Sequence, residues 1–445
     1  MLNTVHRGEG SLVRPTLRVV AASVVAVFLA GACSESEESA PGGGSTTTAA
    51  PSACTPDVPV VTCAPDGTTL GELPAQPVTA SGEPIRIGTI NQDTGAAGAF
   101  PELTQADRAG VRFVNEELGG VGGRPLELVA CDTRFSPAGS QACAQQMVDA
   151  GVVAVVGGID VFGDGITTLE RNGIPYVGGI PVSFASVRSP LSFQFSGGSW
   201  GAMLGFADYV MRELDAKRVS ILHGDFGPIN DAAAYGRRAL EEAGVEVRMV
   251  AMPLVGADFL PLVTTANEGS PDAIVVLTAD TGCVPTMQAA ADLGVTAPLF
   301  LTGACAAPKI LADAGDAAEG RYFNVEGPIR PDDPDPDTAL YTAVVERYGD
   351  GLDAPGAGTV SFRSLMNLYV VMRDLGPDGV TPEAVVEAFR AARDVPSFMG
   401  HPYTCDGEQL AGLAAMCAPQ QIIARFSGGA LEQVSDWIQV GELAG

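Results

Sequence analysis

The sequence predicts an α/β protein of two doubly wound lobes, each a parallel sheet with helices on both faces. Strand-like and helical segments alternate from residue 85 to residue 301. The strand-like segments are short, nearly continuous apolar runs, which is typical of parallel strands buried on both faces. These strands are more numerous than a single sheet readily holds, so the sequence favours two lobes.

The first half of the alternation begins with a strand that runs into a glycine-rich loop at 93–98. A helix follows, and Gly119-Gly120 ends it, since glycine is the usual residue after a helix carboxyl terminus. In order, we expect strands at 85–90, 126–130, 152–156, 174–177 and 192–196, and helices at 102–118 and from about residue 140.

The second half repeats the pattern until an acidic, proline-rich stretch at 331–337 interrupts it. Before that stretch we expect strands at 218–223, 245–252, 273–277 and 298–301, and helices from Trp200, at 231–243 and at 285–293. After it, the apolar spacing predicts helices at 340–348, 362–375 and 382–392, and a last strand at 422–426.

The amino terminus has the pattern of an export signal. An apolar run at 19–30 follows Arg7, Arg14 and Arg18 and ends in Ala30-Gly31-Ala32-Cys33. The run is too short to span a bilayer, which needs about 20 apolar residues. The cysteine resembles the lipobox of bacterial lipoproteins, which implies that 1–32 is a signal peptide and that lipidated Cys33 alone attaches the protein to the membrane. The lipobox usually has leucine three residues before the cysteine, and here that position is Ala30. The alternative is therefore that the signal peptide is cleaved without lipidation and the protein is secreted.

Residues 33–83 are expected to form a disordered, lipid-anchored tether, because the segment is rich in Ser, Thr, Pro and Gly and has little periodicity. The net charge of −28 disfavours nucleic acid as a partner, because phosphates require Lys and Arg.

Nine cysteines minus Cys33 leave eight, an even number that fits an exported protein. They lie in close pairs along the chain, which predicts four disulfides: Cys54–Cys63, Cys131–Cys143, Cys283–Cys305 and Cys405–Cys417. The chain has three histidines and no CxxC motif, so we expect no metal site and no cofactor.

Five segments stand in a specific order and spacing: Ile87-Gly88-Thr89-Ile90, Asn115-Glu116-Glu117, the run from Gly119 to Leu128, Asn172-Gly173-Ile174-Pro175, and ADAGDAAEG at 312–320. They resemble type I periplasmic binding proteins, and most of all the branched-chain amino acid binding proteins of ABC importers. The resemblance covers residues 84–445. It implies a monomer, not an enzyme, that captures a small molecule and delivers it to an importer permease.

The same resemblance implies two lobes joined by three crossover strands near Gly197, Gly327 and 418–421. Lobe 1 is then 84–197 with 328–419, and lobe 2 is 198–327 with 420–445. A ligand-sensing receptor of the same fold is the alternative function, and the sequence does not separate the two.

In lobe 1 the resemblance places four ligand contacts. Phe100 stands where the family often has an aromatic residue. Asp160 follows Gly157-Gly158, where a hydroxyl often grips a carboxylate, and Val182 and Ser183 lie where a second hydroxyl is common. The expected ligand is a small polar molecule, an amino acid, an amide or a related compound. Asp160 would repel a ligand carboxylate, so a free α-amino acid is not the first choice among these; Asp160 either accepts from an amine, amide or hydroxyl or caps a helix.

In lobe 2 the expected contacts lie on loops that follow strands: Trp200, Asp225, Asn230, Asp280, Thr281 and Thr302. Trp200 either stacks on a flat or apolar ligand or packs in the core. Pro228 replaces a common aromatic residue, and Ala304 replaces the family's acidic partner for a ligand ammonium group. The Cys283–Cys305 disulfide is expected to join two of these loops.

Two other motifs suggest different functions. Gly197-Gly198-Ser199-Trp200-Gly201 fits GxSxG between a strand and a helix, which is the setting of a hydrolase nucleophile, with His401 as the candidate base. A secreted serine hydrolase that uses Ser199 is therefore a second alternative. The run Asp332, Asp333, Asp335 and Asp337 suggests calcium, but it lacks the Gly and Glu of an EF-hand loop, which favours a solvated acidic loop.

Overall fold

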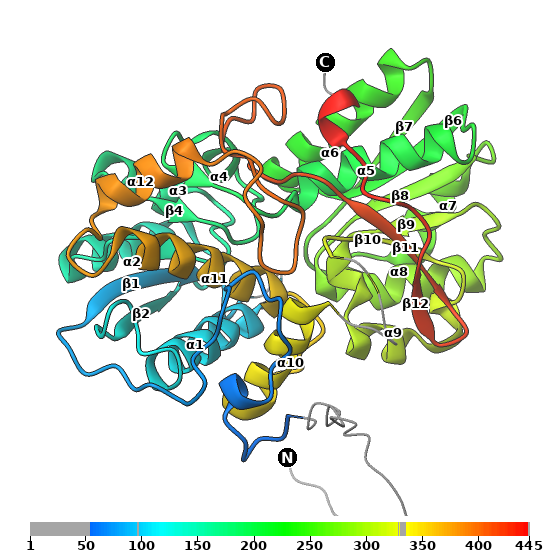
Figure 1. Cartoon of the computed structure of the whole chain (residues 1–445). Coiled ribbons are helices and arrows are strands. Elements are labelled where there is room, and N and C mark those ends of the chain that lie inside the picture. Colours follow the sequence, from blue (N-terminus) through cyan, green and yellow to red (C-terminus); the bar gives the residue numbers. More distant parts are fainter. Residues whose placement is uncertain (1–53, 96–97, 328, 330–334, 444–445) are drawn as a thin grey trace, which may run out of the picture. The chain divides into compact units, whose positions relative to one another are not determined.

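The computed structural model describes residues 54–95, 98–327, 329 and 335–443, all within one structural unit, Pro51–Gly445. Its strands form a five-stranded sheet of order β2-β1-β3-β4-β5 and a seven-stranded sheet of order β12-β11-β10-β9-β8-β6-β7 (Figure 1). The predicted α/β class with mainly parallel sheets is confirmed. No helix in the described part of the chain is long and apolar enough to cross a membrane.

The first sheet is entirely parallel, and β1 (Ile85–Asn91) lies in it between β2 and β3. β1 pairs along its whole length with β2 (Leu126–Asp132), with Ile85 opposite Leu126. The remaining strands are two residues long: β3 (Val155–Val156), β4 (Tyr176–Val177) and β5 (Ser192–Phe193). These three are shorter than the sequence predicted: β3 and β4 begin later than expected, and β5 ends earlier.

Helices cover both faces of the first sheet. On one face α1 (Pro101–Glu116) packs against α10 (Pro336–Tyr348) and α11 (Gly358–Leu375), and α12 (Pro382–Ala391) packs against α11. The other face is covered by α2 (Pro137–Ala150) and α3 (Asp164–Arg171), and the short α4 (Phe184–Arg188) follows β4. The sequence analysis did not predict α3 and α4.

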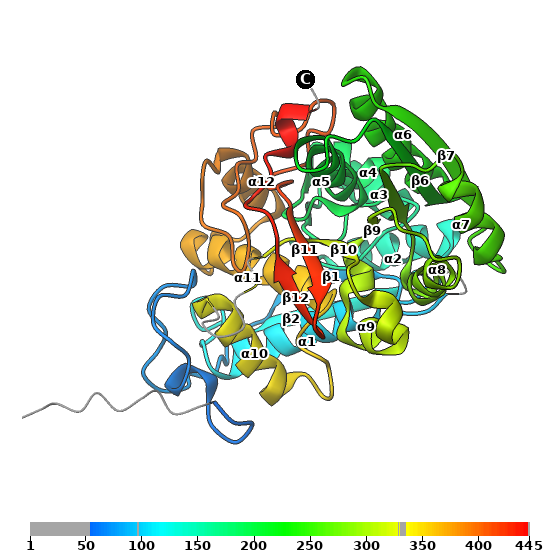
Figure 2. The ribbon, with the colours of Figure 1, turned by 90° about the vertical axis from the view of Figure 1, so that its right-hand side faces the viewer.

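The second sheet is parallel from β10 to β7 and ends in two antiparallel strands at the other edge. Its strands are β6 (Arg218–Gly224), β7 (Glu246–Met252), β8 (Ala273–Leu277), β9 (Leu299–Leu301), β10 (Tyr322–Val325), β11 (Ile422–Ser427) and β12 (Ala430–Gln433). Figure 2 shows β11 and β12, in red, lying side by side. The apolar run of β8 was predicted with the bounds that the structure shows.

Alternate residues of β8 point to opposite faces, as the two-residue repeat of a strand requires. Val275 packs in the core under α5 (Gly198–Arg212) and α6 (Gly227–Glu242), whereas Val276 packs in the core under α7 (Phe259–Asn267), α8 (Asp280–Asp292) and α9 (Pro308–Ala314). Both faces of this sheet are therefore buried. Four 3₁₀ helices complete the described elements: Val60–Thr62, Gly303–Ala306, Gly315–Ala318 and Val440–Leu443.

The chain passes between the two sheets three times, and hydrogen bonds join the three passages. Glu326, which follows β10, accepts through one carboxylate oxygen from the Ser196 hydroxyl (2.9 Å), the Gly197 N–H (2.7 Å) and the Gln421 amide (3.1 Å). Its other oxygen lies 3.4 Å from a guanidinium nitrogen of Arg363 on α11. Arg363 also donates to the carbonyl oxygens of Phe195, Glu326 and Met399.

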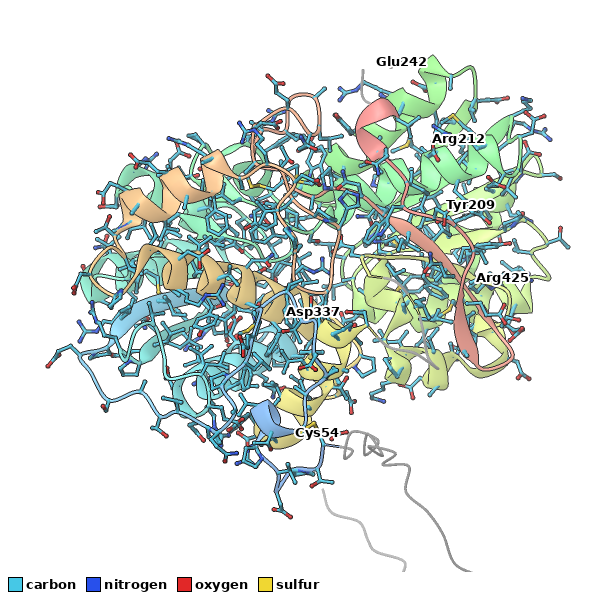
Figure 3. All side chains as sticks on the ribbon, in the orientation of Figure 1. Cys54, Tyr209, Arg212, Glu242, Asp337 and Arg425 are labelled. Carbon is cyan, nitrogen blue, oxygen red and sulfur yellow. A yellow bond between two sulfur atoms is a disulfide. The ribbon has the colours of Figure 1, made fainter. Side chains whose placement is uncertain are left out.

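The prediction of a disordered tether is wrong for residues 54–83. Val60 and Leu70 are buried in the core of the first sheet, and the N–H of Val61 donates to Glu117. Thr69 donates through its N–H and its hydroxyl to Asp337 of α10, which Figure 3 labels together with Cys54. The few apolar residues of this segment are enough to order it, because they pack into the core that the first sheet already forms. Residues 34–53 and the signal segment with Cys33 lie outside the described residues.

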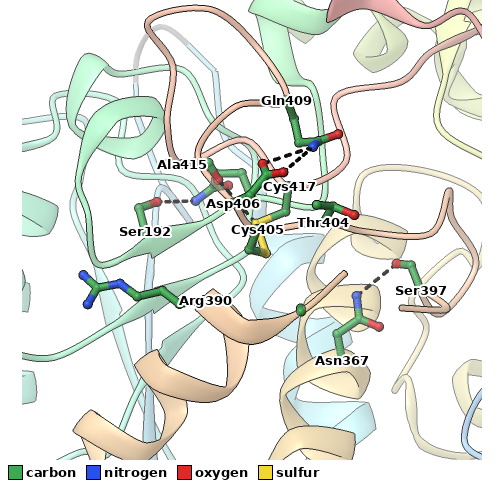
Figure 4. Close-up of a disulfide and its surroundings, with 12 residues drawn as sticks. Ser192, Asn367, Arg390, Ser397, Thr404, Cys405, Asp406, Gln409, Ala415 and Cys417 are labelled. Carbon is green, nitrogen blue, oxygen red and sulfur yellow. Dashed lines mark hydrogen bonds between the residues drawn. A yellow bond between two sulfur atoms is a disulfide. The ribbon is translucent and has the colours of Figure 1, made fainter. Parts of the chain in front are cut away.

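All four predicted disulfides are present: Cys54–Cys63, Cys131–Cys143, Cys283–Cys305 and Cys405–Cys417. Figure 4 shows the Cys405–Cys417 disulfide. Next to it, the two carboxylate oxygens of Asp406 accept hydrogen bonds from the Gln409 side-chain amide at 3.1 and 3.2 Å. Cys283–Cys305 joins α8 to the 3₁₀ helix after β9.

Replacing both Cys283 and Cys305 with alanine should lower the free energy of unfolding by about 3 kcal/mol, because the bond closes a loop over a sequence separation of 22 residues and so restricts the unfolded chain. Urea denaturation of the oxidised protein and of the variant measures the difference. Reducing agent should shift the midpoint of the wild type towards that of the variant. Equal midpoints for the oxidised wild type and the variant would contradict the prediction.

Candidate ligand site at the strand ends

The loops at the carboxyl ends of the parallel strands meet where the two sheets face each other. In a doubly wound sheet this edge holds the ligand, because loops and helix amino termini converge there. Gly98, in the loop after β1, has φ of +125°, and a side chain added to it would lie 2.8 Å from the Asp280 carboxylate at the start of α8. The first-sheet loops therefore touch the second-sheet loops.

Three phenylalanines from three different loops pack together at this edge. Phe135 follows β2, Phe162 follows β3 and Phe226 follows β6 of the second sheet. The ring centroids are 5.2 Å apart for Phe135 and Phe162, 5.4 Å for Phe162 and Phe226, and 5.9 Å for Phe135 and Phe226. We call these residues the phenylalanine trio.

The sequence analysis missed the phenylalanine trio. One feature of the sequence could have revealed it: each of these phenylalanines lies in a loop soon after a strand, at the edge where binding residues concentrate. Arg134 and Phe135 also have positive φ values of 52° and 50°, uncommon for residues with a side chain. Their backbone is held by the Asp132 carboxylate, which accepts from the N–H groups of Arg134, Thr94 and Asp93. Partial burial raises the pKa of Asp132, but hydrogen bonds from the Thr94 hydroxyl and from these N–H groups together lower it below its usual value.

Phe100 and Val182 lie at the same edge and belong to a small apolar cluster. Leu103 of α1, Ile159 after β3 and Val182 after β4 are its buried members, and Phe100, Val161, Ile180 and Ala357 pack against them. Phe100 directly precedes α1, and its carbonyl oxygen accepts from the Asn91 side chain at 2.7 Å. The structure brings these two predicted contacts together.

Asp160 and Ser183 are buried and hold the backbone. The two carboxylate oxygens of Asp160 accept from the Ser140 hydroxyl (2.6 Å) and from the Ile166 N–H in the first turn of α3 (3.0 Å). Burial raises the pKa of Asp160, and these hydrogen bonds oppose the rise. Ser183 caps α4 by accepting from the Ser186 N–H. The N-cap residue of α3 is Gly163, but Asp160 accepts from the first turn of that helix, so of the two roles left open these contacts support the structural one.

Trp200 lies in the core of the second sheet and is only 1% exposed. Its ring packs edge-on against Tyr235 of α6 (5.6 Å) and at a tilt against Phe184 of α4 (5.2 Å). Of the two roles that the sequence left open, core packing is the one that its burial supports. Phe184 is 36% exposed, so it is the accessible member of this group.

The remaining second-sheet candidates lie on the expected loops. Asp225, after β6, is exposed and accepts from the Asn230 side chain at 3.2 Å. The Thr302 hydroxyl, after β9, donates to the Thr278 carbonyl oxygen, and the exposed Thr281 donates its N–H to Asp280. Asp280 faces the first sheet, as its contact with Gly98 shows. The described contacts place Asp280, but not Thr302, against the opposite loops.

Carboxylates gather around Phe100 and carry pKa values above their usual range. Burial is the main cause for both Glu102 of α1 and Asp280. The charges of Asp280 and Asp93 raise the pKa of Glu102 further, so these three groups interact across the two sheets. The electrostatic character of this edge is therefore acidic.

A pocket of about 400 Å³ opens beside the phenylalanine trio and is lined by residues from both halves of the molecule. Phe162 and Phe184 supply its aromatic wall, and Gly227 and Pro228 at the start of α6 supply the opposite wall. Arg171 is its basic residue, accompanied by the carboxylates of Asp164 and Asp231.

The GxSxG motif begins α5, and no hydrogen bond in the described residues joins Ser199 to His401. His401 instead packs edge-on against Trp437 at 5.2 Å, and its Nδ1 lies 2.8 Å from the Pro402 carbonyl oxygen. In the acidic run, Asp335 caps α10 by accepting from two N–H groups, and Asp337 is buried against Thr69 and Met399. Asp332 and Asp333 lie outside the described residues.

Comparisons with known proteins agree with this geometry. A family model described as "Periplasmic binding protein" matches residues 84–416. No match was found among curated proteins. Among solved structures, a leucine binding protein LivK from Thermotoga maritima is 19% identical with a TM-score of 0.63, over 79% of this chain and 98% of that one. A fatty acid ABC transporter substrate-binding protein from Thermomonospora curvata is 16% identical with a TM-score of 0.69, over 84% and 96%.

The branched-chain amino acid transporter substrate-binding protein LivJ from Streptococcus pneumoniae, solved with isoleucine, is 17% identical with a TM-score of 0.63, over 80% of this chain and 99% of that one. At these identities the solved structures show a shared fold, and the family model shows membership.

Proposed function

This chain belongs to the periplasmic binding protein family, and from that premise we propose that it captures a small molecule between its two sheets and delivers it to an ABC importer. The observation that carries the proposal is the contact of Phe226 from the second sheet with Phe135 and Phe162 from the first. Loops that meet at the carboxyl ends of two doubly wound sheets form the usual ligand site of such folds.

We further propose that the two sheets mark two lobes that close on the ligand. Lobe 1 comprises 84–197 and 328–419, and lobe 2 comprises 198–327 and 420–445. The hinge lies at the three passages joined by Glu326, where a few residues absorb the rotation. Capture then requires no covalent chemistry, and the site supplies shape and charge.

The family works outside the cytoplasm, and four disulfides fit that oxidising setting. We propose that residues 1–32 direct export and that lipidated Cys33 keeps the protein, as a monomer, near its permease. Mass spectrometry of the membrane fraction, against a Cys33→Ser control, tests the anchor. A diacylated peptide beginning at Cys33 supports it; the same peptide without lipid in the medium contradicts it.

Thermal denaturation with a panel of amino acids, amides, polyamines, aromatic acids and sugars tests capture. A ligand at 100 times its dissociation constant should add about 2.7 kcal/mol of stability. Uptake of the binding compound should fall in a strain that lacks this chain. Binding with normal uptake and a lost transcriptional response would instead indicate a sensing receptor. No shift with any compound, together with unchanged uptake of the whole panel, would contradict the proposal.

A further inference from the structure

The wall that the first sheet offers to the ligand is apolar. Val182 and Ile159 are buried at 8% and 4% exposure in the small cluster that Phe100 covers. The nearest polar side chains of this wall, Asp160 and Ser183, already accept hydrogen bonds from the first turns of α3 and α4. The first sheet therefore offers methyl groups and aromatic rings rather than free hydroxyl groups.

The phenylalanine trio extends this apolar surface to the second sheet. Its rings come from loops after β2, β3 and β6, so any ligand that separates the two sheets at this point contacts at least one ring. Aromatic rings stabilise a bound apolar group because they bury its apolar surface away from water and, where the group is aromatic, because the rings pack against each other. An apolar body is the part of a ligand that this surface recognises.

Three helix amino termini at this edge carry the chain's own carboxylates, whereas α2, α4 and α6 have no acidic residue in their first turns. A helix amino terminus attracts anions. Here Glu102 lies in the first turn of α1, Asp164 in the first turn of α3 and Asp280 in the first turn of α8. The basic residues nearby are the exposed Arg134 next to Phe135, Arg171, which lines the pocket with Asp164 and Asp231, and Arg188, whose guanidinium lies 4.2 Å from the Phe184 ring centroid. A ligand carboxylate would therefore meet more negative than positive charge.

We propose that the site takes a ligand with an apolar body, aromatic or aliphatic, whose polar end carries no negative charge, and that it discriminates against carboxylic acids and zwitterionic amino acids. This inference rests on the proposed capture function and narrows its substrate class. Phe162 and Phe226 bind the body, and Asp280 with Glu102 selects the charge of the polar end.

Titration calorimetry with ligands that share one body and differ in their polar end tests the charge preference. The probes are 3-phenylpropylamine, 3-phenylpropanamide and 3-phenylpropanoate, the same three ends on a decyl chain, and phenylalanine and leucine. The amine or the amide should bind about tenfold or more tightly than the carboxylate on the same body. Raising the salt concentration should reduce the preference of the amine but not that of the amide.

A carboxylate that binds as tightly as its amide overturns the inference. Preferential binding of leucine, or of a sugar from the broader panel, also overturns it, while the capture function stands. If nothing in either set binds and uptake is unchanged without the chain, the capture function itself fails.

Variants test the residues. Phe162→Ala and Phe226→Ala should each weaken the binding of the tightest probe by about 10- to 100-fold. Leu293→Ala, at a 41% exposed residue that follows α8, is the matched control and should leave affinity unchanged. Asp280→Asn should reduce the ratio of the dissociation constants of the carboxylate and the amine by about tenfold. Asp258→Asn, at the start of α7, should leave this ratio unchanged. Equal effects of a variant and its control would overturn the assignment.

Discussion

Replacing Glu326 with leucine should lower the free energy of unfolding by about 3–5 kcal/mol, because it leaves the buried charge of Arg363 without its partner. The Arg363 and Glu326 side chains are 4% and 12% exposed, so water replaces little of the lost interaction. The change also removes the acceptor shared by Ser196, Gly197 and Gln421. Urea denaturation followed by circular dichroism measures the loss.

Two further variants show whether the buried charge is the cause. Glu268→Leu breaks the ion pair with Arg248, whose side chains are 58% and 44% exposed, and should cost at most about 1 kcal/mol. The double variant Glu326→Leu with Arg363→Met removes both charges and should recover much of the stability. A Glu326→Leu protein as stable as Glu268→Leu would contradict the prediction.

Asp107→Asn should stabilise the protein increasingly as the pH rises above about 4, by up to about 1.4 kcal/mol per pH unit. Asp107 of α1 is fully buried, and its oxygens lie under Gly157, where an added side chain would approach them to 2.8 and 2.9 Å. Burial raises the pKa of Asp107 well above its usual range; the Thr89 hydroxyl and Arg108 oppose the rise, and Asp93 adds to it.

The sign follows from proton binding. The folded wild type holds the Asp107 proton to a higher pH than the unfolded chain does. The stability that protonated Asp107 contributes to the wild type is therefore complete below the unfolded pKa and is lost as the pH rises through the folded pKa, whereas the asparagine variant does not lose it. Denaturation of both proteins from pH 4 to pH 8 gives the difference. Asp272→Asn is the control with the opposite sign, because N–H groups of Lys217 and Arg218 lower the pKa of Asp272. A difference that does not change with pH would contradict the Asp107 prediction.

The fold was predictable where a strand is one apolar run between helices, as in β8, because burial on both faces leaves a signal in the sequence. It was less predictable where backbone and tertiary contacts decide. β3, β4 and β5 are shorter than their apolar runs, and glycines with positive φ, Gly157 and Gly178, begin the loops directly after β3 and β4. Residues 54–83 have no periodicity, and they are ordered by a core built from distant parts of the chain.

The candidate site was predictable as a set of loops but not as a surface. The resemblance placed Phe100, Val182 and Asp280 on loops that the structure brings to the edge where the two sheets meet. The sequence left Trp200 open between a ligand contact and core packing, and the structure buries it in the core. The phenylalanine trio depends on which loops of the two sheets oppose each other, and no local pattern in the sequence contains that information.

The core of the first sheet combines the beginning of the folded chain with late segments, and a core of the second sheet combines the middle of the chain with its end. Ile87 of β1 shares a core with Leu365 of α11, and Ile221 of β6 shares one with Ile423 of β11. Such distant contacts slow folding, and neither core can close while the carboxyl-terminal part is still emerging. Each disulfide, in contrast, spans 9 to 22 residues. We therefore expect the disulfides to form on a chain whose tertiary structure is still open, so an isomerase that corrects mispaired cysteines would act before the cores exclude it.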